Sequence, residues 1–259
     1  LVTWYQTWNR VLVRGDGVNL AIKAIAKNGP PPLPLRPPVS PDDLDAIFAG
    51  LDVATTPLHA AVWACATLSW WSMCRLGETT IAFYPIRADR HVMRSHLRGT
   101  AMSDAGFAVA RIWLPWTKTT KAKGLDKYIV DCGTHTNAVF ALKHHLSLSP
   151  HSLALASSTP LFAYKATPTS SSLTPLTKQV FLAVIDRALI SAGRETHVGH
   201  SFRIGGATAH WRSKVPLETI KLMGGWQTDV VTQYLRDLGK GLADAHLLTA
   251  NHMAARRLS

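Results

Sequence analysis

The sequence is short of acidic residues and of cysteine, and both shortages narrow what the protein can be. It holds 16 Asp and Glu against 28 Lys and Arg, which gives a formal charge of +12 and a pI near 10.0. Such an excess favours a polyanionic partner, either nucleic acid or an anionic membrane surface. The three cysteines (Cys65, Cys74 and Cys132) are odd in number and lack metal-ligand spacing. We therefore expect buried thiols in a reducing compartment and no disulfide framework.

The sequence also lacks segments that would direct it to a membrane. No apolar run approaches the roughly 20 residues that a membrane-spanning helix needs, and the N-terminus lacks the basic and apolar regions of a signal peptide. Nucleic acid is thus the expected partner, and the expected location is intracellular, nuclear in a eukaryote. Because the chain begins at Leu1 and not at Met, we expect a fragment of a longer protein.

What is present indicates a folded chain in three parts. Of its 259 residues 47% are hydrophobic and 17% charged, which is typical of a globular protein. Residues 1–29 predict two short helices, too little to bury much apolar surface alone. The proline-rich residues 30–41 predict an extended, semi-rigid linker. A helix capped by Ser40 then opens the main domain, residues 42–259.

The main domain is organised around residues 197–236, which hold the residue types that phosphodiester chemistry needs. His200 and Arg203 stand three apart, on one face if the segment is helical. An arginine binds two non-bridging phosphate oxygens bidentately, and a histidine moves protons near neutral pH. Trp226 follows two glycines, and tryptophans of this kind are often plain core. Tyr234, expected on an amphipathic helix, is the only tyrosine after His200 and can serve as a nucleophile.

A second arginine stands at the end of a long apolar helix that we expect from Pro57 to Met73. A buried helix seldom ends in an arginine unless the charge is paired or binds an anion. Arg75 has Glu78 three residues on, so a purely structural ion pair is the alternative. Beside His200 and Arg203, we favour a phosphate site.

Two strands are predicted from alternating apolar residues, over residues 107–113 and 128–132. The connection between them is basic and holds Lys118, Lys121 and Lys123. A lysine on a hairpin is normally a soluble edge residue. Four arginines precede the first strand, in a solvated loop or on a phosphate-contacting surface, and the net charge favours the latter. The candidate contacts to the DNA backbone are Arg87, Arg90, Arg94, Arg98, Lys121 and Lys123.

The ordered set of Arg75, a hairpin lysine, His200–Arg203, Gly-Gly-Trp226 and Tyr234 resembles the tyrosine recombinase (phage integrase) family. The wording SFRIGGATA, then GGW and a final Tyr-x-Arg, is most similar to the Crypton-type recombinases of eukaryotic transposable elements. The resemblance implies a mixed α+β, mainly α-helical catalytic fold with a small antiparallel β-sheet. Residues 1–29 would then be the end of a helical domain that clamps DNA.

The resemblance also implies a reaction in which DNA strands are broken and rejoined through a 3′-phosphotyrosyl intermediate. Tyr234 would be the nucleophile, Arg75, Arg203 and Trp226 would stabilise the transition state, and His200 would assist proton transfer. Lys118 best matches the general acid, with Lys121 as the fallback, and Glu78 would orient Arg75. The implied partner is double-stranded DNA, on which the family assembles as a tetramer, with no metal or other cofactor.

Three other interpretations remain to be weighed. A catalytically inactive, domesticated DNA-binding protein derived from such a recombinase is the main alternative. A type IB topoisomerase uses the same residues, but the Crypton-like wording favours the recombinase. An RNA-binding module lacks a recognisable stacked-aromatic signature. The histidines at 144, 145 and 151 have no carboxylate or cysteine partner at ligand spacing, so a metal site is not favoured.

Overall fold

The computed structural model describes residues 35–236 apart from 168, together with residues 17, 19, 20, 23, 24 and 29. The chain divides into two compact units, Leu1–Leu35 and Arg36–Ser259, and the division falls inside the predicted linker. In the first unit the described residues between 17 and 24 are helical. The remainder of the predicted N-terminal helices and the expected C-terminal helix near residues 246–257 lie outside the described residues. The fold below is that of the second unit.

The second unit begins with a helix whose start the sequence predicts well. Helix α3 spans Pro41–Ala49, and Ser40 caps it in a reciprocal capping box with Asp43. The Asp43 carboxylate is buried and also accepts from the Arg194 guanidinium at 2.6 Å and lies 3.2 Å from the His197 ring. These bonds hold the start of α3 against the segment that leads into residues 200–203. They also give His197 the structural role that the sequence indicates.

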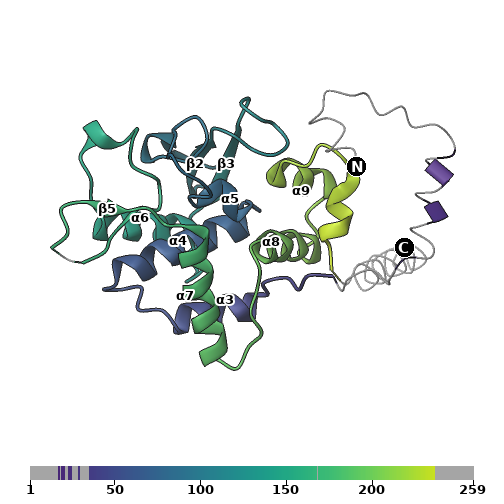
Figure 1. Cartoon of the computed structure of the whole chain (residues 1–259), viewed down its shortest axis with the longest axis horizontal. Coiled ribbons are helices and arrows are strands. Elements are labelled where there is room, and N and C mark those ends of the chain that lie inside the picture. Colours follow the sequence, from purple (N-terminus) through teal and green to yellow (C-terminus); the bar gives the residue numbers. More distant parts are fainter. Residues whose placement is uncertain are drawn as a thin grey trace, which may run out of the picture. The chain divides into compact units, whose positions relative to one another are not determined.

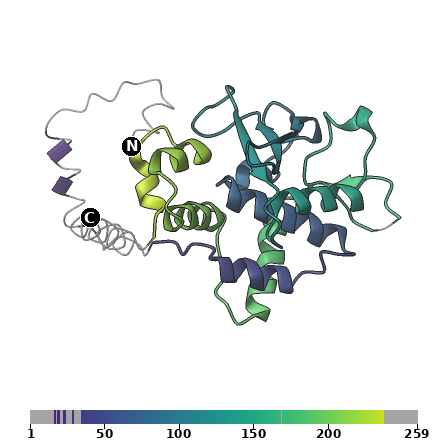
Figure 2. The same cartoon turned by 180° about the vertical axis from the view of Figure 1, so that it is seen from behind.

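Helix α4, Pro57–Trp71, is the centre of the core. Nearly all of its side chains are buried, because other elements surround it. Figures 1 and 2 show the small sheet on one side of α4, and α3 and α7 on the other. Two further helices pack directly on α4: α6, Ala138–Leu148, and α8, Ser201–Arg212. The predicted long buried helix is thus confirmed, ending two residues earlier than expected.

The sheet has three antiparallel strands in the order β1 (Leu97–Met102), β2 (Ala108–Leu114) and β3 (Leu125–Val130). The first predicted strand matches β2, whereas the second overlaps β3 only at residues 128–130, and Arg111 lies opposite Tyr128. The alternating residues that predict them lie on the more exposed face, however, since Phe107 and Tyr128 are each about half exposed. The buried face carries Ile112 and Ile129. The parity differs because both faces of these strands hold apolar residues.

The remaining elements complete a mainly helical unit (Figure 1). They are α5 (Leu76–Thr79), η1 (Arg94–His96), η2 (Leu153–Leu155), β4 (Tyr164–Lys165), β5 (Leu173–Thr174), α7 (Lys178–Ser191), α9 (Leu217–Gly224) and η3 (Asp229–Tyr234). The mixed helical and antiparallel architecture agrees with the predicted fold class. None of the described helices is long and apolar enough to cross a membrane.

Two adjacent glycines let α8 lie against α4. A Cβ on Gly205 would stand 2.0 Å from the Val39 carbonyl oxygen, and one on Gly206 would stand 1.9 Å from that of Trp70. Such approaches are far inside van der Waals contact, so only glycine fits both positions. The two glycines therefore serve close packing within the protein. This packing fixes the depth at which the first turn of α8, with Arg203, sits in the core.

Candidate functional site

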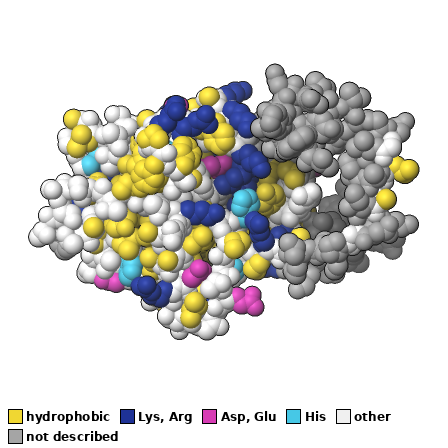
Figure 3. Space-filling view, viewed as in Figure 1, with side chains coloured by type: hydrophobic (Ala, Val, Ile, Leu, Met, Phe, Trp, Pro, Cys, Tyr) yellow, Lys and Arg dark blue, Asp and Glu magenta, His cyan; other side chains and the backbone are white. Residues whose placement is uncertain are grey.

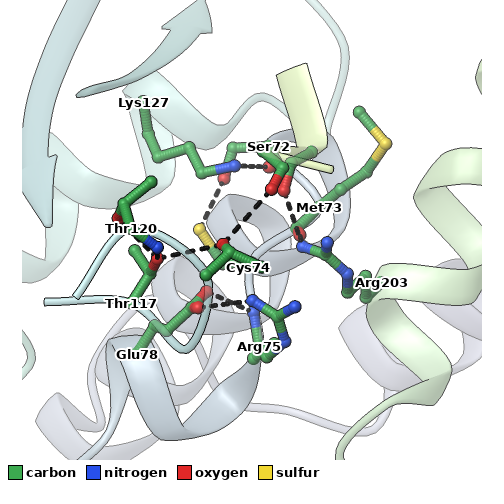
Figure 4. A network of polar contacts seen from close by, with 12 residues as sticks. Ser72, Met73, Cys74, Arg75, Glu78, Thr117, Thr120, Lys127 and Arg203 are labelled. Atoms are coloured by element: carbon green, nitrogen blue, oxygen red, sulfur yellow. Dashed lines mark hydrogen bonds and ion pairs between the residues drawn. The ribbon is translucent and has the colours of Figure 1, made fainter. Parts of the chain in front are cut away.

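The candidate site is built around Arg203, one of the largest fully buried side chains. Its Nη1 donates to two backbone carbonyls, that of Met73 after α4 and that of Gly224 at the end of α9, the latter at 2.9 Å. Arg203 thus joins α8 to two other segments (Figure 4). Burial first, and then the charge of nearby Arg75, lower its pKa to about 10, so the guanidinium stays charged at neutral pH.

The other side of this guanidinium is free to bind an anion. Its Nε and Nη2 are buried, and no acceptor among the described residues reaches them. A buried donor without a partner costs roughly 1–3 kcal/mol, and more when it is charged. The Trp226 ring covers the guanidinium at 3.8 Å, and the Tyr234 ring lies 5.5 Å from it. The guanidinium that carries the unpaired donors therefore lies beside the ring of the predicted nucleophile.

Trp226 owes its position to the two glycines before it. A Cβ on Gly224 would stand 1.7 Å from the indole ring, and Gly225 has a φ of +71° that favours glycine. Trp226 is only 6% exposed and packs in a small apolar cluster with Ile220 and Val231. Its indole nitrogen has no acceptor in the described part of the chain. The side chain is thus core on one side and an unpaired donor beside Arg203 on the other.

Tyr234 lies beside Arg203 and Trp226, but on a different element from the one predicted. It ends a six-residue 3₁₀ helix, Asp229–Tyr234, and not an amphipathic α-helix. Thr228 before this helix and Leu235 after it have extended backbone angles. The ring is half-buried, 5.1 Å from that of Trp226. The Thr208 hydroxyl of α8 donates to the Tyr234 carbonyl at 3.3 Å, which holds the segment against α8.

Arg75 and Glu78 form the pair that their spacing predicts. The Arg75 Nη1 donates to Glu78 Oε1 at 2.8 Å, and the Arg75 amide donates to Oε2 at 2.9 Å. Both residues lie at the start of α5, directly after the turn that Arg203 contacts (Figure 4). The Arg75 side chain keeps 16% of its surface exposed. Glu78 therefore fixes one end of this guanidinium while the rest remains accessible.

His200 is the N-cap residue of α8, with helical backbone angles, and its carbonyl accepts from the Ile204 amide at 3.0 Å. It lies among positive charges. Burial lowers its pKa, and so do Arg36, Arg75, Arg203 and Lys178 in that order. Its ring is consequently neutral at pH 7 and able to accept a proton.

The hairpin lysines lie on the exposed loop between β2 and β3. Lys118, Lys121 and Lys123 are all exposed, as expected of a hairpin. The loop itself is anchored, because the Thr119 hydroxyl donates to the Gly225 carbonyl at 3.3 Å, directly before Trp226. The structure therefore brings the loop beside the Gly-Gly-Trp segment without selecting one lysine. Figure 3 shows basic side chains gathered over the hairpin and the middle of this face.

One functional candidate, Lys127 on β3, is missing from the sequence-based set. It is 2% exposed, and its ammonium group donates to the carbonyls of Ser72 at 2.8 Å and Met223 at 2.5 Å. Burial lowers its pKa, partly offset by the nearby Cys74 thiol. Lys127 lies opposite Ile112 on the inward face of the sheet. In a strand, residues two apart point to the same face, so the position of Lys127 two residues before the apolar Ile129 is the signal that could have identified it.

The predicted surface arginines differ in what they can do. Arg94 is buried, and its guanidinium donates to the carbonyls of Ser149 at 2.6 Å and Ala163 at 2.7 Å, so the structure does not support its assignment to the DNA face. These two bonds tie η1 to the residue after α6 and to the residue before β4. The other three are exposed: Arg87 pairs with Asp89, Arg90 stacks on Trp116, and Arg98 stacks on Trp113.

The cysteines and histidines take structural positions. Cys65 and Cys74 are buried, and burial raises the pKa of the Cys65 thiol to about 12. Cys132 is partly exposed, which corrects the expectation that all three thiols are buried. Two of the histidines first considered for metal contact backbone carbonyls, His144 that of Val53 and His145 that of Leu161. Over the described residues no three His, Cys, Asp or Glu side chains are grouped to hold a metal.

Comparison with solved structures identifies the architecture. The structure resembles the XerA recombinase crystal structure with a TM-score of 0.50 at 15% identity, over 96% of this chain and 72% of XerA. The fold is that of the XerA recombinase. A XerH site-specific recombinase bound to a palindromic difH substrate, in a post-cleavage complex, matches with a TM-score of 0.49 at 14% identity over 87% of this chain.

This recombinase fold comes from structural similarity alone. The chain spans about half of the XerH chain, 54%. No protein-family model matches the sequence, and no curated protein matches it. What the fold provides is a frame that gathers Arg75, His200, Arg203, Trp226 and Tyr234 from segments up to 159 residues apart in sequence (75 to 234).

Proposed function

We propose that this chain is the catalytic part of a tyrosine site-specific recombinase or integrase, of the Crypton type found in transposable elements. The observation that carries the proposal is the buried Arg203 guanidinium, which has two unpaired donors and lies 5.5 Å from the Tyr234 ring. Arg75 and His200 lie close enough to change the charge balance of the same site. Two arginines, a neutral histidine and a phenol around one point suit a phosphodiester and few other groups.

The proposed reaction begins with attack of the Tyr234 phenolic oxygen on a DNA phosphorus. The bond from phosphorus to the 5′ oxygen breaks, which leaves a 3′-phosphotyrosyl link and a free 5′ hydroxyl. The phenolic proton passes toward the neutral His200, and a hairpin lysine, for which Lys118 remains the first choice, protonates the leaving oxygen. Attack by a second strand's 5′ hydroxyl reverses these steps and rejoins the DNA, so no nucleotide cofactor is consumed.

The arginines stabilise the charge that builds up on the non-bridging oxygens during attack. Arg203 offers Nε and Nη2, and the buried indole nitrogen of Trp226 offers a third donor. Arg75 is held by Glu78 before substrate arrives, so little ordering remains for the reaction itself. Arg203 has no exposed surface in this conformation, so part of the cover over it must open before a phosphate reaches the two free donors.

That cover is also the observation that favours a second function. An Arg203 with no exposed surface suits a DNA-binding protein in which the old catalytic centre has become core. On this alternative the chain binds duplex DNA through exposed basic residues such as Arg87, Arg90 and Lys123, and no covalent link forms. The two functions differ in one observable, a covalent bond between Tyr234 and DNA.

The experiment uses a suicide substrate, a nicked duplex that carries the terminal sequences of the transposable element that would encode the protein. Wild type, Tyr234→Phe and the exposed control Tyr128→Phe are incubated with it, and denaturing gels detect covalent protein–DNA bands. We expect a band from wild type and from Tyr128→Phe and none from Tyr234→Phe. Binding without any band supports the domesticated DNA-binding protein. A band that survives in Tyr234→Phe contradicts the assignment of the nucleophile.

The wider protein is also part of the proposal. Residues 1–29 would belong to a helical DNA clamp, and recombination would require a tetramer on two DNA sites, in the nucleus of a eukaryotic host. Deleting the residues after Gly241 tests whether the C-terminal segment supports this assembly. We expect sedimentation with DNA to show smaller complexes for the deletion variant, and an unchanged assembly would contradict the role of that segment.

A further inference from the structure

Two helices end at the same place, next to the candidate site. At the end of α4, the Ser72 amide donates a hydrogen bond to the Leu68 carbonyl, and the Cys74 amide donates to that of Ser69. The end of α9 is closed in a similar way: the Gly225 amide donates to the Leu222 carbonyl, and the Trp226 amide to that of Lys221. Each helix end carries about half a negative charge on its remaining carbonyls. Two helix ends that converge therefore form a site for cations.

Lys127 and Arg203 occupy this place together, and they take neighbouring carbonyls in each segment. At the end of α4, Lys127 binds the Ser72 carbonyl and Arg203 binds that of Met73. At the end of α9, Lys127 binds the Met223 carbonyl and Arg203 that of Gly224. We call these two side chains and four carbonyls the carbonyl clamp (Figure 4). It joins β3, α4, α8 and α9.

The clamp holds the two segments that lead to the other phosphate donors. Arg75 is two residues after Met73, and Trp226 is two residues after Gly224. Met73 has a φ of +52°, a left-handed conformation that is uncommon for a residue with a side chain. This turn needs neighbours that hold it, and Arg203 does so by donating to the Met73 carbonyl. A shift of the turn would move Arg75 directly.

We propose that Lys127 is a positioning residue, which aims Arg75 and Trp226 at one phosphate by tying the ends of α4 and α9 together. The inference rests on the proposed function, because it concerns the efficiency of the same cleavage step. Lys127 does not need to reach the DNA. Its ammonium group is buried and engaged with carbonyls, whereas Lys118, Lys121 and Lys123 remain exposed for that task.

The division of labour between the two cations follows from their free donors. Arg203 has two N–H groups left for a phosphate after its carbonyl contacts. Because Lys127 binds the adjacent carbonyls, Arg203 needs only one of its nitrogens, Nη1, for the clamp. Without Lys127 the Ser72 and Met223 carbonyls would be buried without a donor. Arg203 would then hold both segments alone.

The test compares Lys127→Met, which keeps the length and apolar stem of the side chain but removes its charge, with two controls. Lys143→Met removes an exposed lysine from α6. Ile185→Ala opens the core within α7, away from the clamp, and serves as the control for reduced stability. Each protein is measured for thermal unfolding, for duplex affinity, and for the rate of covalent complex formation on the nicked substrate under single-turnover conditions.

We expect Lys127→Met to form the covalent complex about 100-fold more slowly than wild type, with duplex affinity within about threefold, because a donor displaced by an ångström costs a factor of that order. Ile185→Ala should be destabilised as well but should cleave at close to the wild-type rate at a temperature where both variants are folded. A Lys127→Met rate within threefold of the Ile185→Ala rate would overturn the proposal and leave Lys127 as an ordinary structural residue.

A second readout does not depend on cleavage. The indole N–H resonance of Trp226, assigned by its loss in Trp226→Phe, reports the position of this ring by NMR. We expect it to shift or broaden in Lys127→Met and to stay in place in Lys143→Met and Ile185→Ala. If wild type forms no covalent complex, the proposed function fails, while the shift still tests the clamp. An unchanged Trp226 resonance in Lys127→Met overturns the positioning role in either case.

Discussion

The buried centre of the site and the hairpin loop beside it hold their cations in opposite ways. In the centre, Arg203 and Lys127 are fixed by backbone carbonyls and have almost no exposed surface. In the loop, Lys118 and Lys121 are exposed, and the Lys121 ammonium group lies over the face of the Trp116 ring. Packing fixes the position of the cationic group in the buried centre, whereas exposure to solvent leaves its position unfixed in the loop. Substitutions in the two regions should therefore differ in kind.

The largest effect is expected from Arg203→Lys in the buried centre. Lysine keeps the charge but cannot hold two carbonyls and a phosphate in one plane, so the cleavage rate should fall by about 1000-fold or more. The matched control is Arg94→Lys, another buried arginine bound to carbonyls, but outside the site. It should lose stability and retain cleavage. Equal loss of cleavage in both variants, measured on the nicked substrate, would erase the distinction between site and core.

The next effect tests the packing that places Arg203. Gly206→Ala brings a Cβ to within 1.9 Å of the Trp70 carbonyl oxygen, so α8 must move away from α4. We expect the free energy of unfolding to fall by about 3 kcal/mol in urea titrations. Gly77→Ala, where nothing lies within 4 Å of the added Cβ, is the control and should be neutral or stabilising. A neutral Gly206→Ala would show that the α4–α8 contact is looser than described.

The third prediction sharpens the loop side of the comparison. Lys118→Met, Lys121→Met and Lys123→Met should leave stability unchanged, because all three side chains are exposed. One of them, Lys118 by our assignment, should slow cleavage about 100-fold. In a substrate with sulfur in place of the 5′ bridging oxygen, the leaving group is a thiolate that needs no proton. This substrate should therefore restore the cleavage rate of that variant alone. Rescue of Lys121→Met instead would move the general acid to the fallback residue.

The smallest effect concerns pH. Because burial and four neighbouring cations lower the pKa of His200 below its usual 6.5, the ring stays largely neutral as the pH falls to that value. The wild-type cleavage rate should then change by less than about twofold between pH 7.5 and 6.5 and decline at lower pH. His200→Gln should be slower and lack this acidic decline. A tenfold drop by pH 6.5 would contradict a lowered pKa.

The sign of the stability effect is the same. The unfolded chain binds a proton at His200 near pH 6.5, whereas the folded chain does so only at lower pH. The contribution of this residue to stability is therefore complete above pH 6.5 and is lost as the pH falls through the window below it. Thermal unfolding of His200→Gln should depend less on pH in that window than wild type does.

Much of the fold could be predicted from local sequence signals. The Ser40 cap, the apolar run of α4 and the apolar stripe of α7 each identify a helix, because capping and burial are properties of consecutive residues. The Arg75–Glu78 ion pair can also be predicted from the sequence, because a spacing of three residues brings the two side chains together.

What could not be predicted depends on contacts between distant segments. Lys127 meets carbonyls 55 and 96 residues away, and no local pattern reports such a partner. Both faces of β3 carry apolar residues, so alternation alone does not reveal that Lys127 points inward. The 3₁₀ conformation before Tyr234 was missed for a related reason, because a six-residue segment has too few positions to distinguish one helical period from another.

The Trp226 cover over Arg203 also makes this arginine a reporter of opening. Phenylglyoxal reacts with guanidinium groups only where it can reach them, and Arg203 has no exposed surface, whereas Arg87 and Arg111 are exposed. In a time course the exposed arginines are modified first, and Arg203 is modified at a rate set by how often the indole swings away. Peptide mapping of that one adduct thus measures, without any DNA, the fraction of molecules whose centre is open.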